Sequence, residues 1–202
     1  MSARKMRGFS IVELMIVCAI IMIMLGTAFI QIAPMLKESQ ANAALQTTLG
    51  MMRRTQEMAV DQRQIYRLTF TAPRTIQLDQ VAIDPKTNAR TFVLQSTIDL
   101  PTQTQFVVVS GLPNTAATVP DGYGNGSVAI DFDRDNGVST NQIYFQRDGR
   151  ALNANNLINN GLIYMCRPGE LSSCKAVSLI GATGRSKGWR ISQTGGTTKW
   201  VQ

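Results

Sequence analysis

An apolar run of 25 residues near the amino end, Phe9 to Ala33, is the feature that most constrains how this chain can fold. As an α-helix it would be about 37 Å long, which exceeds the roughly 30 Å hydrocarbon core of a bilayer. Only eight residues precede the run, and it is longer than the apolar core of a secretory signal. We therefore expect it to remain in the mature protein as a membrane-spanning helix.

The charges on either side of this run predict its orientation. Arg4, Lys5 and Arg7 lie directly before it, whereas only Lys37 and Glu38 follow it closely. Because basic residues are enriched on the cytoplasmic side of membrane spans, the amino end is expected in the cytoplasm. Everything after residue 34 is then expected outside the inner membrane.

Glu13 is an acid inside the apolar run. Such a residue costs on the order of 2.5 to 3.5 kcal/mol in the bilayer interior on insertion scales, and it usually has a charged partner. No basic residue within the run can serve as that partner. Two interpretations are open: the carboxyl lies near the cytoplasmic headgroups, about 9 Å along a helix from Arg7, or its partner comes from elsewhere.

Gly8, Phe9 and Glu13, in the segment RGFSIVELMIV, closely resemble the processing and methylation motif of type IV prepilins and type II secretion pseudopilins. The resemblance implies that prepilin peptidase cleaves between Gly8 and Phe9 and that Phe9 is then N-methylated. Glu13 would become the fifth mature residue and would offset an amino-terminal charge, its own or a neighbouring subunit's, in the filament core. Proteolysis would thus create the missing partner.

The chain is accordingly expected to have four parts. Residues 1–8 are the leader, 9–36 the membrane and filament-core helix, 37–63 an amphipathic continuation of that helix, and 64–202 an exported domain rich in β-structure. In the amphipathic part, apolar or uncharged side chains recur at helical spacing; they are Leu45, Leu49, Met52, Gln56 and Ala59.

After Gln64 the pattern changes to short β-like runs separated by turn signals. The pairs Asn136-Gly137 and Asp148-Gly149 are typical of hairpin turns, and residues 114–126 favour a loop. The fold class expected is α+β, in which a long amino-terminal helix packs on antiparallel sheets, as in pilins. The expected strands are 65–70, 75–81, 90–98, 105–111, 127–132, 141–146, 161–166, 175–181, 188–193 and 197–202.

Three cysteines differ in their surroundings. Cys18 lies in the apolar helix, whereas Cys166 and Cys174 bracket the segment CRPGELSSC on the exported side. Oxidising conditions there favour a disulfide, and the Pro-Gly pair between them is typical of a type II turn. A structural bridge is favoured over a redox-active pair, because the spacing is not C-x-x-C.

Three alternating acids, Asp131, Asp133 and Asp135, resemble the start of a calcium loop. Gly137 falls one position late, and Gln142 stands where an EF-hand would have a bidentate glutamate. We therefore expect a polar strand edge whose acids share a solvent-facing side, although calcium binding stays open.

Enzymatic chemistry has little support in the sequence. The chain has no histidine, which removes the commonest general base and metal ligand, and it shows no Gly-rich phosphate loop or nucleophile elbow. The protein is expected not to be an enzyme and to need no cofactor and no metal.

Positive charge gathers at the carboxyl end. The formal net charge is +7, and residues 147–202 carry +6 of it. Arg185, Lys187, Arg190 and Lys199 could neutralise nucleic-acid phosphates, with Trp189 or Trp200 stacking on a base. The alternative is a solvated basic surface whose tryptophans belong to the core.

The segments FQRDGRA and ATGRSKGWR, with one long helix before a β-rich remainder, resemble the GspH/FimT family of minor pilins and pseudopilins. Some members of that family are DNA receptors that use a carboxyl-terminal Gly-Arg-x-Arg motif. This chain has Gly184-Arg185-Ser186-Lys187, and the lysine keeps the charge but lacks the bidentate fork of arginine.

The sequence therefore predicts a minor subunit of a type IV pilus, and the alternative is a GspH-type minor pseudopilin of type II secretion. The expected partners are prepilin peptidase, the inner membrane, other minor pilins or pseudopilins, and the filament. The globular domain is expected in the periplasm of a bacterial cell, where it either primes filament assembly or captures DNA.

Overall fold

The computed structural model describes residues 10–115, 117–124, 127–137, 139–194 and 196–202, without the side chains of residues 27–34, 134 and 194. The chain divides into two compact units, Met1–Glu38 and Ser39–Gln202. One helix, α1 (Ile11–Asp61), begins in the first unit and ends in the second. Among the described residues, no helix is both long enough and apolar enough to cross a membrane.

The second half of α1 is amphipathic, as its sequence predicts. Leu49, Met52 and Ala59 are buried, whereas Arg53 and Glu57 are exposed. Two buried threonines on the same side, Thr48 and Thr55, donate their hydroxyls to the carbonyls four residues earlier. The helix ends at Asp61, two residues before the expected boundary, and Arg63 adopts a left-handed backbone (φ 52°) that turns the chain into the first strand.

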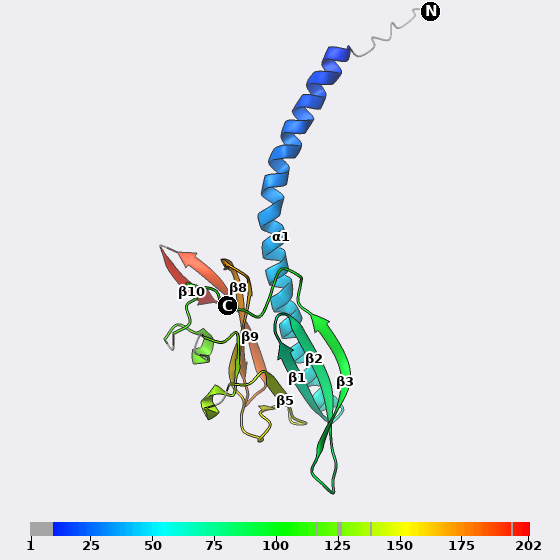
Figure 1. Ribbon diagram of the computed structural model, residues 1–202, viewed down its shortest axis with the longest axis vertical. Coiled ribbons are helices and arrows are strands. Elements are labelled where there is room, and N and C mark those ends of the chain that lie inside the picture. Colours follow the sequence, from blue (N-terminus) through cyan, green and yellow to red (C-terminus); the bar gives the residue numbers. More distant parts are fainter. Residues whose placement is uncertain (1–9, 116, 125–126, 138, 195) are drawn as a thin grey trace, which may run out of the picture. The chain divides into compact units, whose positions relative to one another are not determined.

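The remainder forms two antiparallel five-stranded sheets (Figure 1). The first sheet has the order β3-β2-β1-β5-β6 and the second has the order β10-β9-β8-β7-β4. The first contains β1 (Ile65–Thr71), β2 (Thr75–Ile83), β3 (Arg90–Asp99), β5 (Gln142–Phe145) and β6 (Ala151–Leu152). The second contains β4 (Ile130–Phe132), β7 (Gly161–Arg167), β8 (Glu170–Ile180), β9 (Arg185–Thr194) and β10 (Thr197–Val201).

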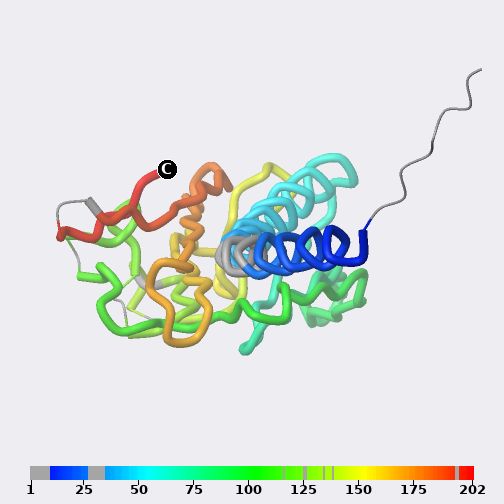
Figure 2. The backbone as a smooth tube through the Cα atoms, turned by 90° about the horizontal axis from the view of Figure 1, so that it is seen from above, coloured from blue at the N-terminus to red at the C-terminus, as the bar shows by residue number. Residues whose placement is uncertain are grey.

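Two of the four terminal strands, β3 and β10, lie on opposite sides of the second unit, as two perpendicular views show (Figures 1 and 2). Each is bonded to one neighbour within the described sheets, β3 to β2 and β10 to β9. The second unit therefore has an open sheet edge on each side.

The α+β class and most strands are confirmed, but two expectations about the strands were wrong and one strand was missed. Residues 105–111 form no strand and contribute only the isolated bridge between Gln105 and Cys166. The run 127–132 is a strand only over Ile130–Phe132. The short strand β6 was not predicted, because two residues carry too little pattern to recognise.

The two turn signals have different outcomes. Asp148-Gly149 forms the turn between β5 and β6, where Gly149 has a left-handed φ of 84°. Asn136-Gly137 lies in a longer reversal: Asn136 ends a single 3-10 turn, η2 (Arg134–Asn136), and an antiparallel bridge between Phe132 and Thr140 closes the loop. The strands on its two sides belong to different sheets, β4 and β5.

A hydrophobic core joins α1 to both sheets. Alternation in β1 places Tyr66, Leu68 and Phe70 on the side facing this core, as predicted. The second sheet contributes side chains of β7 and β8, including Met165 and Val177. Both sheets thus bury one side against the same helix.

The second sheet also buries its other side. Leu162, Tyr164 and Ala176 form a second apolar cluster with Leu112 and Val119, which come from the long connection between β3 and β4. A second short turn, η1 (Pro120–Gly122), lies in this connection. Of the residues expected to form a strand over 105–111, Val107–Val109 instead cover this outer side of the sheet, whereas Phe106 packs in the main core.

Tyr164 lies at the centre of this outer cluster. Its ring stacks on Trp200 with centroids 5.7 Å apart, and its hydroxyl has no hydrogen-bond partner among the described residues. Burial, with a smaller contribution from the negative charge of Asp131, raises the pKa of Tyr164. The folded chain therefore keeps this phenol neutral at a pH where the unfolded chain ionises it.

Two results are expected for Tyr164. The unfolded phenol ionises near pH ~10 while the folded one does not, so the free energy of unfolding should fall as the pH rises above about 10. Tyr164→Phe keeps the ring and removes an unpaired buried hydroxyl, so at neutral pH it should leave that free energy unchanged or raise it by about 1 kcal/mol. The variant should also lose part of the alkaline dependence. Urea unfolding at neutral and alkaline pH measures both, and a less stable variant would contradict the assignment.

Candidate functional site

The predicted processing residues Gly8 and Phe9 lie outside the described residues. Glu13 lies in the first turn of α1. Unpaired backbone N–H groups at a helix start carry partial positive charge, so this is a favourable position for a carboxylate. The only described neighbours of Glu13 along the helix surface are apolar or small side chains, since the next charged residue in the chain is Lys37.

The four predicted basic residues divide between the two sides of the second sheet. In β9, Lys187 pairs with Ser178 of β8, whose neighbour Leu162 belongs to the outer cluster. Directly paired residues share a side of a sheet and successive residues alternate, so Arg185 and Lys187 lie on the outer side.

Arg190 and Lys199 lie on the helix-facing side. Arg190 pairs with Lys175, which in turn pairs with Met165 of the main core. Lys199 pairs with Ser192, two residues from Arg190, so the two exposed bases are diagonal neighbours on adjoining strands. The structure therefore brings the four bases together as two pairs and not as one cluster.

Lys187 belongs to a polar network that holds the connection between β3 and β4, which we call the covering loop, against the second sheet. Its Nζ donates to Asp121 Oδ1 at 2.7 Å, and Ser178 Oγ donates to Asp121 Oδ2 at 2.5 Å. Trp189 Nε1 in turn donates to Ser178 Oγ at 2.9 Å. The ammonium of Lys187 is thus largely neutralised within the protein, and its side chain is only 26% exposed.

The two tryptophans pack in the outer cluster. Trp200 Nε1 donates to the carbonyl of Pro113 at 2.8 Å, and its ring stacks on Tyr164. Trp189 packs against the same cluster. Both rings therefore have partners inside the fold, which agrees with the alternative in which the tryptophans belong to the core.

Gly184, the first residue of the Gly-Arg-x-Arg-like segment, is required by the fold. It adopts a left-handed φ of 65°, and a Cβ there would lie 2.1 Å from the carbonyl oxygen of Gly149. The nearby Gln56 Nε2 of α1 donates to the carbonyls of Gly149 and Thr183, both at 2.9 Å. This contact joins the helix to the β5–β6 turn and to the turn that precedes β9.

Cys166 and Cys174 form a disulfide across the β7–β8 hairpin. The turn between them has Gly169 at a left-handed φ of 77°, as position i+2 of a type II turn requires. Closing this nine-residue loop is expected to contribute roughly 2 to 3 kcal/mol in the chain-entropy model. Cys18 remains a free thiol on α1.

The three alternating acids do not line a solvent-facing strand edge, so that expectation was wrong. Asp131 and Asp133 are buried, and Asp133 is bonded to the amides of Asn136 and Asn153. Asp131 accepts from Ser139, and Asp135 accepts from Asn160. Each carboxylate has its own partners, and no group of three metal-ligating side chains occurs in the described part of the chain.

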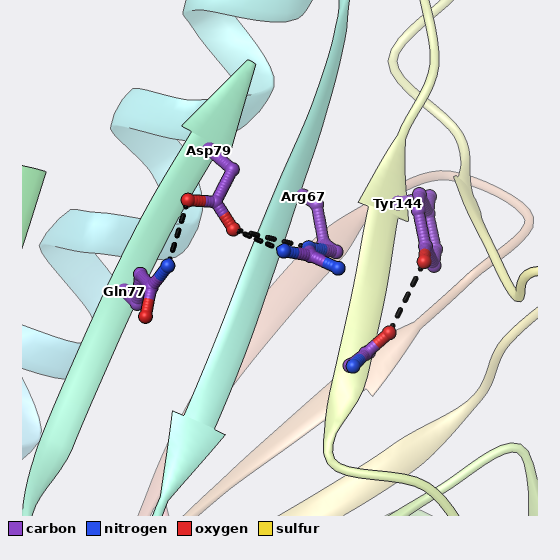
Figure 3. A network of polar contacts seen from close by, with 5 residues as sticks. Arg67, Gln77, Asp79 and Tyr144 are labelled. Carbon is purple, nitrogen blue, oxygen red and sulfur yellow. Dashed lines mark hydrogen bonds and ion pairs between the residues drawn. The ribbon is translucent and has the colours of Figure 1, made fainter. Parts of the chain in front are cut away.

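A polar network on the outer side of the first sheet was missed by the sequence analysis (Figure 3). Arg67 of β1 pairs with Asp79 of β2, and its Nη2 donates to Asp79 Oδ2 at 2.6 Å. Gln77 donates to the other carboxylate oxygen of Asp79, and the guanidinium of Arg67 stacks 3.5 Å from the ring centroid of Phe92. The hairpin register of IYRLTF against TIQLDQV is the signal that could have revealed the Arg67–Asp79 pair.

Gly184→Ala is expected to destabilise the protein by at least about 2 kcal/mol, because the new methyl group would collide with a backbone carbonyl at an unfavourable φ. Gly169→Ala is the matched control: its φ is also left-handed, but no atom lies within 4 Å of the added Cβ. It should cost only about 1 kcal/mol. Chemical denaturation measures both, and equal losses would contradict this role for Gly184.

Comparisons with known proteins agree with the amino-terminal motif. Residues 3–29 match the family described as the prokaryotic N-terminal methylation motif, which confirms the predicted prepilin motif. No curated protein matches the chain. A crystal structure of the type IV minor pilin FimU from Pseudomonas aeruginosa is similar over 76% of this chain and 91% of that one, with 12% identity and a TM-score of 0.44. The chain thus carries a prepilin-type methylation motif at its amino end, and a long helix packed on antiparallel sheets follows it.

Proposed function

We propose that this protein is a minor structural subunit of a type IV pilus. The observation that carries the proposal is the match of residues 3–29 to the methylation motif, which contains Gly8, Phe9 and Glu13. The helix that follows the motif continues without a break to Asp61 in the exported unit. One chain thus combines a processing signal, an apolar helix for the filament core and a folded domain to display.

Processing would supply the charge that Glu13 lacks. Cleavage between Gly8 and Phe9 removes the three leader bases and creates an amino group on Phe9, four residues before Glu13. Residues four apart lie on one face of a helix, about 6 Å apart along its axis. A positive amino end and a carboxylate held at this spacing can pair within one chain or between neighbours, which offsets the cost of placing each in an apolar core.

The exported unit fits a role in packing and display. Its polar side chains make intramolecular contacts: Lys187 bonds to Asp121, Arg67 to Asp79, and Gln56 to two turns. The sequence has no histidine to act as a general base. We infer that its partners are other minor pilins and the filament, with the amino end in the cytoplasm, the anchor in the inner membrane and the globular unit in the periplasm.

A GspH-type pseudopilin of type II secretion would use the same processing and the same helix. The two functions differ in the filament that the subunit joins. Deleting the gene in its host separates them, because loss of surface pili supports the pilus role, whereas loss of protein secretion with normal pili supports the secretion role.

Processing is tested first on the membrane form of the protein. Mass spectrometry should show a chain that begins at Phe9 and carries one added methyl group. Gly8→Ala should block cleavage, because the peptidase recognises the glycine before the cut. Glu13→Ala should still be cleaved but should not enter filaments.

Ser10→Ala is the matched control, and it should be processed and assembled normally. An intact Met1 leader in the native protein, or normal maturation of Gly8→Ala, would contradict the proposal.

DNA capture is a second candidate role, favoured by the +6 charge of residues 147–202. The sheet geometry limits how it could occur, because Arg185 and Lys187 lie on one side of β9 while Arg190 and Lys199 lie on the other. A duplex that binds one side meets one pair. The exposed pair Arg190 and Lys199 is the better candidate, since Lys187 is already bonded to Asp121.

Two matched double variants test this role. Two phosphate contacts predict a slope of log affinity against log salt near −1.8, at about 0.9 per contact. Arg190→Ala with Lys199→Ala should abolish that slope, whereas Arg185→Ala with Lys187→Ala should leave it unchanged. Fluorescence anisotropy of a labelled duplex over a salt series measures both. Absent binding, or equal losses in the two variants, would reject DNA capture through this pair and leave the assembly role.

A further inference from the structure

The strand β3 is an open and apolar sheet edge. It is the terminal strand of the first sheet, and β2 is its one bonded neighbour in the described residues. Three successive side chains near its middle are exposed: Phe92 by 42%, Val93 by 52% and Leu94 by 59%. Its ten residues, RTFVLQSTID, contain no proline and no lysine, two of the residues that protect sheet edges. Such an edge can accept another strand.

The backbone groups that β3 offers to a partner follow from its ladder with β2. Beyond its two ends, Leu100 N–H donates to Arg74 O at 2.8 Å and Asp84 N–H donates to Ala89 O at 2.9 Å. Hydrogen-bonded and non-bonded pairs alternate along an antiparallel ladder. Counting inward from these two bonds, the residues of β3 bonded to β2 are Thr91, Val93, Ser96 and Ile98.

A bulge in the middle of β3 changes which residues point outward. Gln95 has no partner in β2, because Leu78 pairs with Ser96 and Asp79 pairs with Leu94. The outward backbone groups therefore belong to even-numbered residues before the bulge and odd-numbered residues after it. They are those of Arg90, Phe92, Leu94, Thr97 and Asp99.

This set of outward groups is complementary to itself. When two copies of β3 run antiparallel and centred on the bulge, Arg90 faces the partner copy's Asp99 and Phe92 faces the partner copy's Thr97. Both members of each pair direct their N–H and C=O groups outward, so each pair can exchange two backbone hydrogen bonds. A register one residue away would oppose outward groups to inward ones.

Charge selects the same register. Arg90 at one end of β3 and Asp99 at the other have opposite signs, so an antiparallel pair joins a cation to an anion at both ends. The Asp99 side chain is 51% exposed, and the guanidinium of Arg74 is 3.9 Å away from its carboxylate. Arg90 donates to Asn156 at 3.3 Å and lies 5.3 Å from the Tyr144 ring centroid; both contacts are within its own copy and would be exchanged for the partner copy's Asp99.

We propose that β3 is a self-pairing edge, through which the exported units of two copies of this chain form a two-fold antiparallel dimer. The side chains of Arg90, Phe92, Thr97 and Asp99 share the outer side of the sheet, where the ring of Phe92 contacts Arg67. The dimer makes one continuous sheet of ten strands, two sets of five, and covers the exposed Phe92 and Leu94 at its centre.

The symmetry of this contact defines where it can occur. A two-fold contact uses the same surface on both copies and is closed, so it does not propagate. It also reverses the direction of residues 39–61 of α1 in one copy relative to the other. Subunits that enter a filament share one direction, so the dimer belongs to subunits that have not been assembled and competes with their assembly.

Disulfide trapping tests the register in the full chain in detergent, with Cys18→Ser in every variant. Val93 faces the partner copy's Ser96 as a non-bonded pair, for which the Cα atoms are about 4.5 Å apart and within disulfide range. Val93→Cys with Ser96→Cys should give a covalent dimer on mild oxidation. In each single-cysteine variant, the cysteines of the two copies are offset by three residues along the paired strands, about 10 Å. The single variants should therefore give no covalent dimer.

Charge exchange separates this dimer from unspecific association. Arg90→Asp or Asp99→Arg alone opposes like charges at both ends, and each should weaken dimerisation about tenfold in sedimentation equilibrium. The double exchange restores two opposite pairs and should return the dissociation constant to within about threefold of the native value. Thermal unfolding of each variant checks that the monomer is intact.

Three outcomes would overturn the proposal. They are a failure of the double-cysteine variant to cross-link, single charge variants that dimerise as the native chain does, and a full chain that stays monomeric. A dimer that forms regardless of all these substitutions would be held by its anchors and not by β3.

Discussion

The packing of both sheets on one helix face is the interaction on which the rest of the structure depends. The two sheets are separate hydrogen-bonded units, and buried side chains of residues 44–59 of α1 form one core with both. Gln56 adds a directional contact, since its amide donates to two turns that precede β6 and β9. The helix thus sets the position of each sheet, and the positions of the sheets determine which side chains lie on the surface of the second unit.

Several residues of the carboxyl-terminal basic segment, which resembles a binding motif, stabilise the fold at the outer cluster. Trp189 and Trp200 fill this cluster, Lys187 holds Asp121 of the covering loop, and Gly184 fits against Gly149 where no Cβ is tolerated. Only Arg190 and Lys199 among the four predicted bases lie exposed together on one side of the sheet. A motif found by residue type therefore overstated the number of free charges, because alternation along β9 sends neighbours to opposite sides.

How much could be predicted depends on whether a signal is local. The amphipathic helix and the β1–β2 hairpin follow from periodicity, since Tyr66, Leu68 and Phe70 alternate with polar residues over a short range. Residues 105–111 have the same β-like composition but form no strand, since Phe106 packs in the main core and Val107–Val109 cover the outer side of the second sheet. Composition alone does not distinguish these environments from that of a strand. The buried Asp131 and Asp133 were also missed, because their asparagine and serine partners lie up to 20 residues away.

The first sheet shows how a polar pair and apolar side chains share one side of a sheet. Asp79 is almost fully buried on the outer side of β2, with Arg67 and Gln77 bonded to its two oxygens and the ring of Phe92 stacked over the guanidinium. An unpaired carboxylate at this buried position would lower the free energy of unfolding by several kcal/mol. A register that separates Arg67 from Asp79 is therefore disfavoured. The network anchors Phe92 of β3 by its ring, and this holds an apolar side chain at an open edge. The β3 edge is therefore stable in the monomer, and burying Phe92 against a second copy would still be favourable. A reversible contact requires both.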